Sequence, residues 1–431
     1  MRVSASSNTL AHGFRALRHR NFRLFLGGQI VSLVGTWMQQ LALGWLVYRL
    51  THSAFLLGLV GFVGQIPSLF LSPFAGVWAD RFNRHRIVIG TQTLSMLQAF
   101  VLAALVLLGV VRVWHILALS LFIGVVNAVD VPTRQAFLVQ MVGGKRDDLA
   151  NAIALNSSTF NAARLVGPSI AGLLVARVGE GTVFLLNGLS YAAVILALFA
   201  MRVSPQPPSA HAGAPLWHTL REGVGYVAGS AAMRTLLLLL GLVGLVGVPF
   251  TVLMPVFATD VLQGDADTLG FLMAAVGLGA LAGALTLAAR KSVRGLGALI
   301  AGSVALFGAS LVALSLSRSV PLSLLLFFLS GFGVMVQMAG SNTILQTIVD
   351  DEQRGRLMSF YAVANMGTQP LGSLCAGAIA AHIGAPRTVL LGGLGCLAGA
   401  AGFARVLPTL RKEVRPIYAR LGIAAVAPPE P

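Results

Sequence analysis

Long apolar runs separated by short polar stretches make up most of this chain. Twelve of the runs come close to the roughly 20 residues that a helix needs to cross the hydrocarbon core of a bilayer. Each is expected to be helical, because backbone groups in lipid must find hydrogen bonds within their own segment. The pattern therefore predicts an all-α integral membrane protein, with segments at 22–48, 55–78, 87–110, 115–140, 149–177, 182–201, 235–259, 268–289, 296–317, 320–348, 357–381 and 388–405.

Composition supports the same class. Hydrophobic residues fill 56% of the 431 positions and charged residues only 10%, whereas a soluble domain is about one quarter charged. The two cysteines, Cys375 and Cys396, fall inside apolar runs and have neither a disulfide framework nor metal-ligand spacing. No metal or cofactor is therefore expected. Residues 1–23 are polar and basic, so no cleavable signal is predicted.

The positive charges predict the orientation. With the N-terminus in the cytoplasm, 23 of the 30 lysines and arginines fall on the cytoplasmic side and 5 on the outer side. The remaining two, Arg134 and Arg164, lie inside predicted segments. By the positive-inside rule, both termini are expected in the cytoplasm. The net charge of +16 follows from this bias, so it requires no nucleic-acid partner and fits attraction to anionic membrane lipids.

A proline-rich stretch divides the chain into two halves. Residues 204–215 read SPQPPSAHAGAP, which cannot form a helix and is typical of a linker. A weak internal repeat, offset by about 205 residues, pairs a stretch ending in Val178-Gly179 with one ending in Ile383-Gly384. The predicted organisation is an N-terminal six-helix bundle at 1–201, a cytoplasmic linker at 202–233, a C-terminal six-helix bundle at 234–407 and a cytoplasmic tail at 408–431.

The short stretch between the second and third segments carries a compact charge motif. Gly76 is followed four residues later by Asp80, then by Arg81 and by a basic end that includes Arg84. The positive-inside rule explains the arginines but neither the glycine nor the acid. The motif resembles the loop between helices two and three of major facilitator transporters, which reads roughly G-x-x-x-D-R-x-G-R-[RK].

Further motifs are similar to one bacterial branch of that superfamily, the twelve-helix drug:proton antiporters, which includes macrolide efflux pumps and an enterobactin exporter. They are GTWMQQ at 35–40, LTHS at 50–53, DVPTRQA at 130–136, RLVGP at 164–168 and RGRLMS at 354–359.

The resemblance implies two six-helix bundles with parallel repeats and a substrate site between them. It also implies a monomeric multidrug-type efflux protein of the bacterial inner membrane. Such a protein exports an amphipathic small molecule by alternating access, with protons as the coupling ion. A dedicated siderophore or metabolite exporter is the alternative, and a non-transporting receptor or scaffold is the alternative of another class. An enzyme is not expected, because the segments contain no paired carboxylates, nucleophile–histidine set or metal cluster.

Two motifs depart from the family pattern. Asn83 replaces a glycine of the charged loop and is expected to tolerate its left-handed turn, while His85 replaces a fixed cation with a pH-dependent one. The glycine-rich motif of helix five survives only as Gly167, Pro168 and Gly172. Its upstream glycines are missing, so the motif supports the fold more strongly than it supports antiport.

Asp130 is the only acidic residue within the predicted segments, and it shares a helix face with Asn127 and Arg134. An ionisable side chain at membrane depth indicates a functional role, so Asp130 is the candidate proton carrier. Three alternatives remain open. Asp130 is spaced for an i,i+4 ion pair with Arg134, it could contact substrate, or it could take part in a latch. In the family, an acid of helix four pairs with the loop arginine, here Arg81 or Arg84.

The resemblance also implies that Asp80 caps the start of the eleventh segment through the helix dipole. It further implies that breaking these contacts of the charged loop lets the two halves of the protein move relative to one another.

The two membrane arginines outnumber the single acid, which leaves the N-terminal half with excess positive charge. One hypothesis is that an anionic or polar substrate group faces this half, while the apolar C-terminal half holds a hydrophobic body. The alternative is that Arg164 bonds a backbone carbonyl near Gly167. Polar residues expected to line the substrate cavity, or else to act as glue between helices, are Trp37, Gln40, Asn127, Asn161, Asn365 and Gln369.

Overall fold

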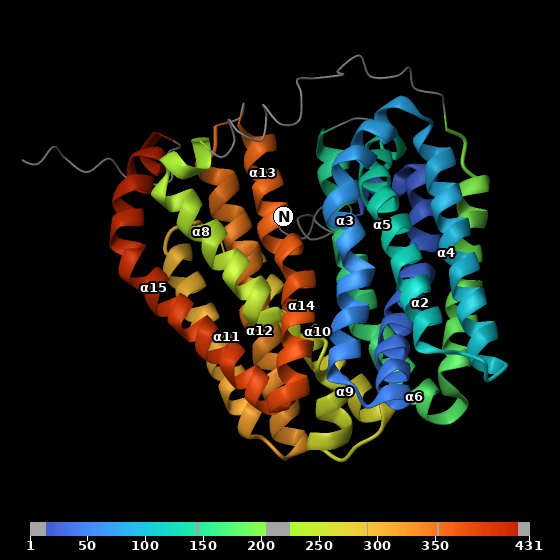
Figure 1. Ribbon diagram of the computed structural model, residues 1–431. Coiled ribbons are helices and arrows are strands. Elements are labelled where there is room, and N and C mark those ends of the chain that lie inside the picture. Colours follow the sequence, from blue (N-terminus) through green and yellow to red (C-terminus); the bar gives the residue numbers. More distant parts are fainter. Residues whose placement is uncertain (1–13, 144–145, 204–224, 291, 351–352, 421–431) are drawn as a thin grey trace, which may run out of the picture. The chain divides into compact units, whose positions relative to one another are not determined.

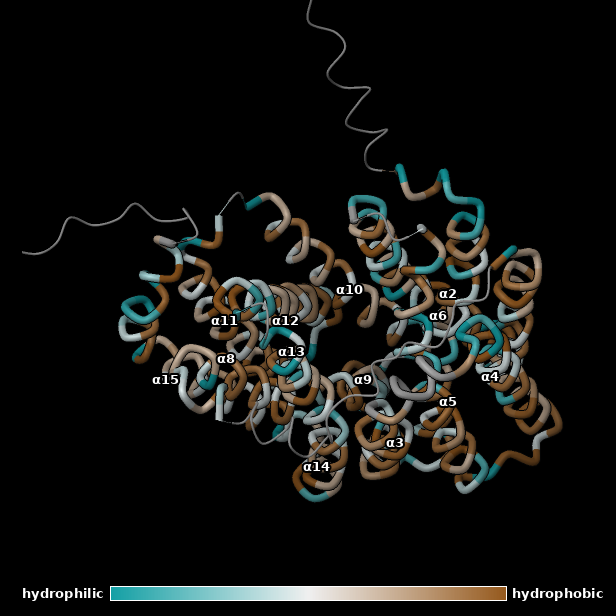
Figure 2. The backbone as a smooth tube through the Cα atoms, turned by 90° about the horizontal axis from the view of Figure 1, so that it is seen from above, coloured by the Kyte–Doolittle hydropathy of each residue, from teal (hydrophilic) through white to brown (hydrophobic). Residues whose placement is uncertain are grey.

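The computed structural model describes residues 14–143, 146–203, 225–290, 292–350 and 353–420, without the side chains at 73, 75–81, 146 and 420. Within these ranges every regular element is a helix, which confirms the predicted all-α class. All twelve predicted segments overlap helices over most of their length, and several run one to three residues past a helix end. Hydrophobic stretches run along the helices (Figure 2). Ten described helices are long and apolar enough to cross a membrane, so the count of twelve crossings stays a prediction.

The described residues form two compact units. Unit 1 comprises residues 1–52, 63–212 and 265–274, and unit 2 comprises 53–62, 213–264 and 275–431. The helices of the first half of the chain are a 3-10 turn η1 (Arg15–Arg18), α2 (Arg20–Thr51), α3 (Ala54–Arg81), α4 (Arg84–Leu107), α5 (Val113–Met141) and α6 (Arg146–Phe199) (Figure 1).

The second half has more breaks in its helices. Short π turns, η2, η4 and η5, interrupt two of the predicted segments. The elements are α8 (Ala231–Leu242), η2 (Val243–Gly247), η3 (Val248–Thr251), α9 (Met254–Val256), η4 (Phe257–Val261), α10 (Ala266–Ala288), α11 (Leu296–Leu316), α12 (Val320–Ile348), α13 (Arg354–Ala362), η5 (Val363–Gly367), α14 (Thr368–Ile383) and α15 (Ala385–Arg420) (Figure 1).

Two glycines turn the chain at equivalent places in the internal repeat. Gly179 breaks α6 with φ 78° and ψ 168°, and Gly384 joins α14 to α15 with φ 85° and ψ 155°. This region of backbone space is essentially restricted to glycine. The break in α6 separates two predicted segments and positions Glu180, whose carboxylate forms a bidentate ion pair with Arg49 of α2, at 2.7 and 3.3 Å.

Glycines also allow helices to touch through their backbones within each unit. In unit 1, a Cβ added at Gly172 of α6 would lie 2.9 Å from the Cα of Gly270 in α10. In unit 2, a Cβ added at Gly377 of α14 would lie 2.9 Å from the Cα of Gly58 in α3. Real Cβ atoms do not come this close to backbone, so both crossings depend on small residues, as helix contacts in membranes commonly do.

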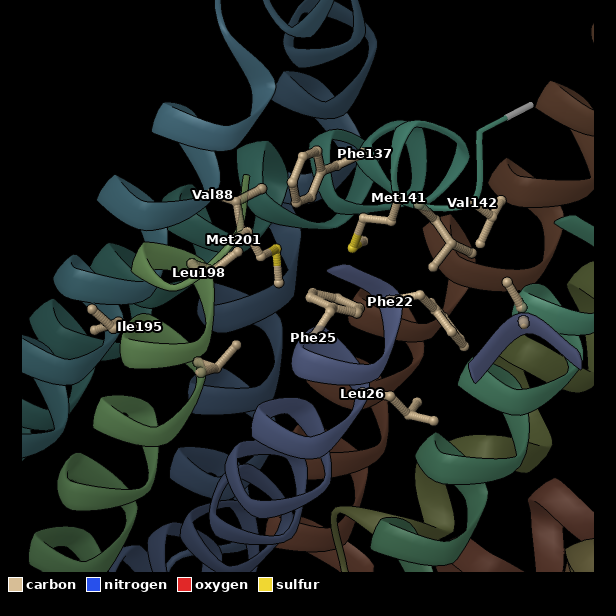
Figure 3. Packing of buried hydrophobic residues seen from close by; sticks show 14 of the residues in the cluster. Phe22, Phe25, Leu26, Val88, Phe137, Met141, Val142, Ile195, Leu198 and Met201 are labelled. Atoms are coloured by element: carbon tan, nitrogen blue, oxygen red, sulfur yellow. The ribbon is translucent and has the colours of Figure 1, made fainter. Parts of the chain in front are cut away.

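An aromatic cluster fills one end of unit 1. Phe22 and Phe25 of α2 meet Phe137 and Met141 of α5, and Leu198 of α6 closes the group (Figure 3). All but Met141 are fully buried, and Met141 is 4% exposed. The cluster ties α2, α5 and α6 together at the end where α4 begins.

The short link between α3 and α4 corrects one expectation. Asn83 has φ −67° and ψ 106°, so it is not left-handed. Its side chain instead accepts a hydrogen bond from the backbone nitrogen of Arg86 at 3.3 Å, which caps the first turn of α4. Asparagine is among the residues preferred at this capping position, and that preference decides its conformation here.

Candidate functional site

The carboxylate of Asp130 lies buried in α5 with three donors around it. Its Oδ1 accepts hydrogen bonds from Thr91 Oγ1 at 2.7 Å and from Gln92 Nε2 at 2.9 Å. Its Oδ2 lies 3.2 Å from Arg134 Nη2, one helical turn away. A buried charge is costly unless it is both paired and hydrogen-bonded, and Asp130 meets both conditions.

The sequence pointed to Asp130 and Arg134 but not to their partners on α4. Thr91 and Gln92 open a polar series that continues with Ser95 and Gln98, all four of them buried. Four polar side chains at this spacing in an apolar segment would have been the signal, since residues three, four and seven apart share a helix face. This polar series faces α5 at one end and α2 at the other.

A second polar group joins three helices of unit 1. Gln39 Nε2 of α2 donates to Gln98 Oε1 of α4 at 3.1 Å, and Asn187 Nδ2 of α6 donates to Gln39 Oε1 at 2.8 Å. All three side chains are buried. Hydrogen bonds of this kind hold membrane helices together. The predicted cavity residue Gln40 lies next in sequence and is exposed.

Arg164 of α6 lies over an aromatic ring. Its Cζ is 5.6 Å from the centroid of the Trp37 ring, a distance that allows a cation–π interaction. The rings of Trp37 and Phe160 pack edge to face, with their centroids 5.5 Å apart. A Cβ added at Gly167 would lie 2.6 Å from the Cβ of Trp37, so this motif glycine lets α6 come close enough for the stacking.

Arg164 has no acidic counterpart in the described part of the chain. Neither an ion pair nor a hydrogen bond to a backbone carbonyl is formed by its guanidinium there, and the side chain is partly exposed. The buried carboxylate of Asp130 is already paired with Arg134. The positive charge of Arg164 is therefore available to a bound molecule.

The other predicted cavity residues are placed less specifically. Asn161 Nδ2 donates to the carbonyl of Ser157 at 2.9 Å, and Gln369 Nε2 donates to the carbonyl of Asn365 at 2.7 Å. Both amides thus bond to their own helices. Asn127 is exposed on α5, and Asn365 lies in the π turn η5, a kind of irregularity often found at functional positions.

The charged loop motif is only partly described. Gly76, Asp80 and Arg81 fall in the last turns of α3, where the side chains lie outside the described residues. Arg84 opens α4. The latch between this loop and Asp130 therefore stays a prediction, as does the capping role of Asp80.

A charge cluster at the start of α6 was not foreseen. Asp148, just before the predicted segment 149–177, is fully buried and contacts three side chains near η1. His19 Nε2 lies 3.0 Å from its Oδ2, Arg18 Nη2 bonds the same oxygen, and Arg15 Nε lies 2.9 Å from Oδ1. Hydrogen bonds from His19 and Arg18 hold the pKa of the Asp148 carboxyl well below its usual range.

Comparison with known proteins places these features in context. The sequence family described as Transmembrane secretion effector matches residues 11–417. The Staphyloferrin A transporter of Staphylococcus aureus is 27% identical over 86% of this chain and 92% of its own length. The multidrug efflux pump Tap of Mycolicibacterium fortuitum is also 27% identical, over 85% of this chain and 91% of its own length.

A likeness in structure extends the fold comparison. The crystal structure of a POT family transporter in complex with 5-aminolevulinic acid superposes with a TM-score of 0.70. The match covers 91% of this chain and 96% of the other at 12% sequence identity. At this identity, the similarity is one of fold.

Proposed function

Since the chain belongs to the transmembrane secretion effector family of the major facilitator transporters, we propose that it exports an amphipathic organic molecule by alternating access. It is a multi-pass membrane transporter with a small-molecule substrate, and its relatives are efflux-type proteins. The proposal extends to inward protons as the driving ion, to a monomer in the bacterial inner membrane and to termini on the cytoplasmic side. It includes no enzymatic step.

The observation that carries the substrate class is the pair formed by Arg164 and Trp37. A cation stacked on an aromatic ring, with no acidic partner among the described residues, suits a ligand that combines a negative group with an apolar body. Ionisable residues at membrane depth mark substrate or ion paths by default. We therefore propose that the exported molecule carries an anionic or strongly polar group that contacts Arg164.

Transport in proteoliposomes with an imposed pH gradient tests this assignment. The probes are an amphipathic carboxylate and its methyl ester, which differ only in the charge. We expect Arg164→Gln to slow export of the carboxylate at least tenfold and to leave export of the ester within about twofold, because a charge-assisted contact contributes roughly 1.5–3 kcal/mol. Export of the carboxylate by Arg164→Lys should be slower than by the unchanged protein and faster than by Arg164→Gln, because lysine keeps the charge but loses the planar stacking.

Arg177→Gln is the matched control, because this arginine lies exposed further along α6. It should leave both probes unaffected. An equal loss of both probes in Arg164→Gln, with unchanged folding, would show that the arginine has a structural role instead. A chain that shows no gradient-dependent flux of any probe would be a receptor or scaffold.

A dedicated siderophore exporter is the second candidate. It is favoured by the relative named as a Staphyloferrin A transporter, which spans most of both chains. A narrow substrate range, with one metal-chelating carboxylate exported and unrelated drugs ignored, would select it over a multidrug pump.

A further inference from the structure

Unit 2 contains an apolar cavity of about 330 Å³ beside the last part of α15. Its lining comes from the start of α8, the link between α10 and α11, the end of α12, and α15. Besides Ala232, five of the lining side chains are apolar and buried. They are Leu236, Ile344, Phe403, Leu410 and Val414. The volume lies at the lower end of the range for small-molecule sites.

Three arginines stand around this cavity. Arg294 comes from the link between α10 and α11, and Arg411 and Arg415 come from successive turns of α15. All three are exposed, and no ion pair to any of them occurs in the described part of the chain. Among the described residues, the apolar cavity thus carries three cations without an acidic partner at its edge.

The acid nearest along the helix is already engaged elsewhere. Glu413 accepts hydrogen bonds from Ser230 Oγ at 2.7 Å and from the backbone nitrogen of Ala232 at 3.2 Å. These contacts cap the first turn of α8 and satisfy donors that a helix start leaves open. Glu413 therefore holds α15 against α8, and it forms no ion pair with the three arginines in the described part of the chain.

The link that carries Arg294 is held by its own hydrogen bonds. Arg290 Nη2 donates to the carbonyl of Arg294 at 2.6 Å, and the backbone nitrogen of Arg294 donates to Ser292 Oγ at 3.2 Å. Gly295 follows with φ 74°, a left-handed turn that starts α11. These contacts place Arg294 directly before the start of α11.

The end of α15 is apolar on the side that lines the cavity and carries several exposed cations. Leu407, Leu410 and Val414 recur at helical spacing and face the cavity, whereas Arg411, Lys412 and Arg415 are exposed. Clusters of lysine and arginine directly after a membrane helix attract anionic lipid headgroups. The cavity and its arginines thus lie where lipid headgroups are expected.

We propose that this cavity binds an anionic phospholipid, with the phosphate held by Arg294, Arg411 and Arg415 and an acyl chain inserted among the buried apolar side chains. A free anion would leave the apolar lining unused. A zwitterionic lipid would bring its own ammonium group close to three guanidinium groups, at an electrostatic cost. The site is separate from the transported substrate, so it stands whether or not the proposed export is correct.

Lipid binding to the purified full-length protein tests the proposal. Phosphatidylglycerol and phosphatidylcholine with identical acyl chains are added to delipidated protein in detergent, and bound lipid is counted by native mass spectrometry. We expect one phosphatidylglycerol to be retained at least tenfold more strongly than phosphatidylcholine. Replacing two arginines, in Arg411→Gln/Arg415→Gln, should remove that preference.

The matched control is Arg405→Gln/Lys412→Gln, which removes two exposed cations from the same helix outside the cavity. It should bind phosphatidylglycerol within twofold of the unchanged protein. Val293→Trp is the second variant, because it keeps all three arginines and places a bulky ring at the cavity edge. It should weaken lipid binding while leaving weak binding of inorganic phosphate unchanged.

Four outcomes would overturn the proposal. These are equal retention of both lipids, an equal loss in the control pair, undiminished lipid binding by Val293→Trp, and a tight complex with inorganic phosphate alone. A fifth would name another occupant. If removal of residues 421–431 creates a lipid site that the full chain lacks, the chain's own tail fills the cavity.

Discussion

At the scale of single residues, the buried ion pair of Asp130 and Arg134 should tolerate the loss of both charges better than the loss of one. Asparagine at position 130 would keep an acceptor for Thr91 and Gln92 but leave Arg134 without its counter-charge. We expect Asp130→Asn to destabilise the protein by about 1–3 kcal/mol. Adding Arg134→Gln should recover part of this loss, because no unpaired charge then remains. Thermal unfolding in detergent measures both effects.

The same variant decides between a latch and a proton carrier. If Asp130 belongs to a latch with the charged loop, Asp130→Asn and Asp80→Asn should shift the balance of inward- and outward-open states alike, as measured by distances between spin labels. Selective loss of proton flux in Asp130→Asn, with Asp80→Asn unaffected, would identify Asp130 as the carrier.

Asp148 offers a second test at residue scale, with its control next to it. Asp148 is buried among His19, Arg18 and Arg15, whereas the side chain of Asp147 is 77% exposed and lies 3.5 Å from Arg15. We expect Asp148→Asn to loosen η1 from α6, seen as faster amide exchange over residues 15–18. Asp147→Asn should leave exchange there unchanged, and equal effects would mean that the cluster does not hold η1.

At the scale of elements, the corners at Gly179 and Gly384 should not tolerate a side chain. Neither position is crowded, so the penalty comes from the backbone conformation, at about 1–3 kcal/mol each. Gly179→Ala and Gly384→Ala should therefore lower the unfolding midpoint. Gly27→Ala in α2 and Gly302→Ala in α11 are matched controls, because both glycines are helical with open space around them. If the control variants lower the unfolding midpoint as much as the corner variants do, the penalty does not come from the backbone conformation of the corners.

The elements also show what could be predicted from the sequence. Length and hydrophobicity identified the all-α class and placed the apolar segments largely on helices, and the boundary between 177 and 182 anticipated the break at Gly179. The π turns η2, η4 and η5 were not predicted, since a single inserted residue barely changes an apolar pattern. Thr91 and Gln92 were missed as partners of Asp130, because helices that are apolar nearly all round do not reveal which side faces which neighbour.

At the scale of the whole molecule, the two halves share a repeat but differ in charge. Asp130, Arg134 and Arg164 all lie well inside predicted segments of the N-terminal half, whereas the segments of the C-terminal half contain only Arg405, at the very end of 388–405. We propose that 1–201 and 234–407 are the two bundles and that the first recognises the polar part of the substrate. The all-α membrane class was readable from the sequence. The substrate was not, because its identity depends on how side chains meet across helices.

The glycine corners carry a mechanical consequence. Gly384 is the single residue between α14 and α15, and Gly179 is the single non-helical residue within α6. One residue has only two soft torsions. Only these two torsions can absorb a change in the angle between the helices at each corner. A tilt of the helix before the corner must be passed directly to the helix after it. We therefore expect a displacement of one helix of each pair to displace the other helix as well.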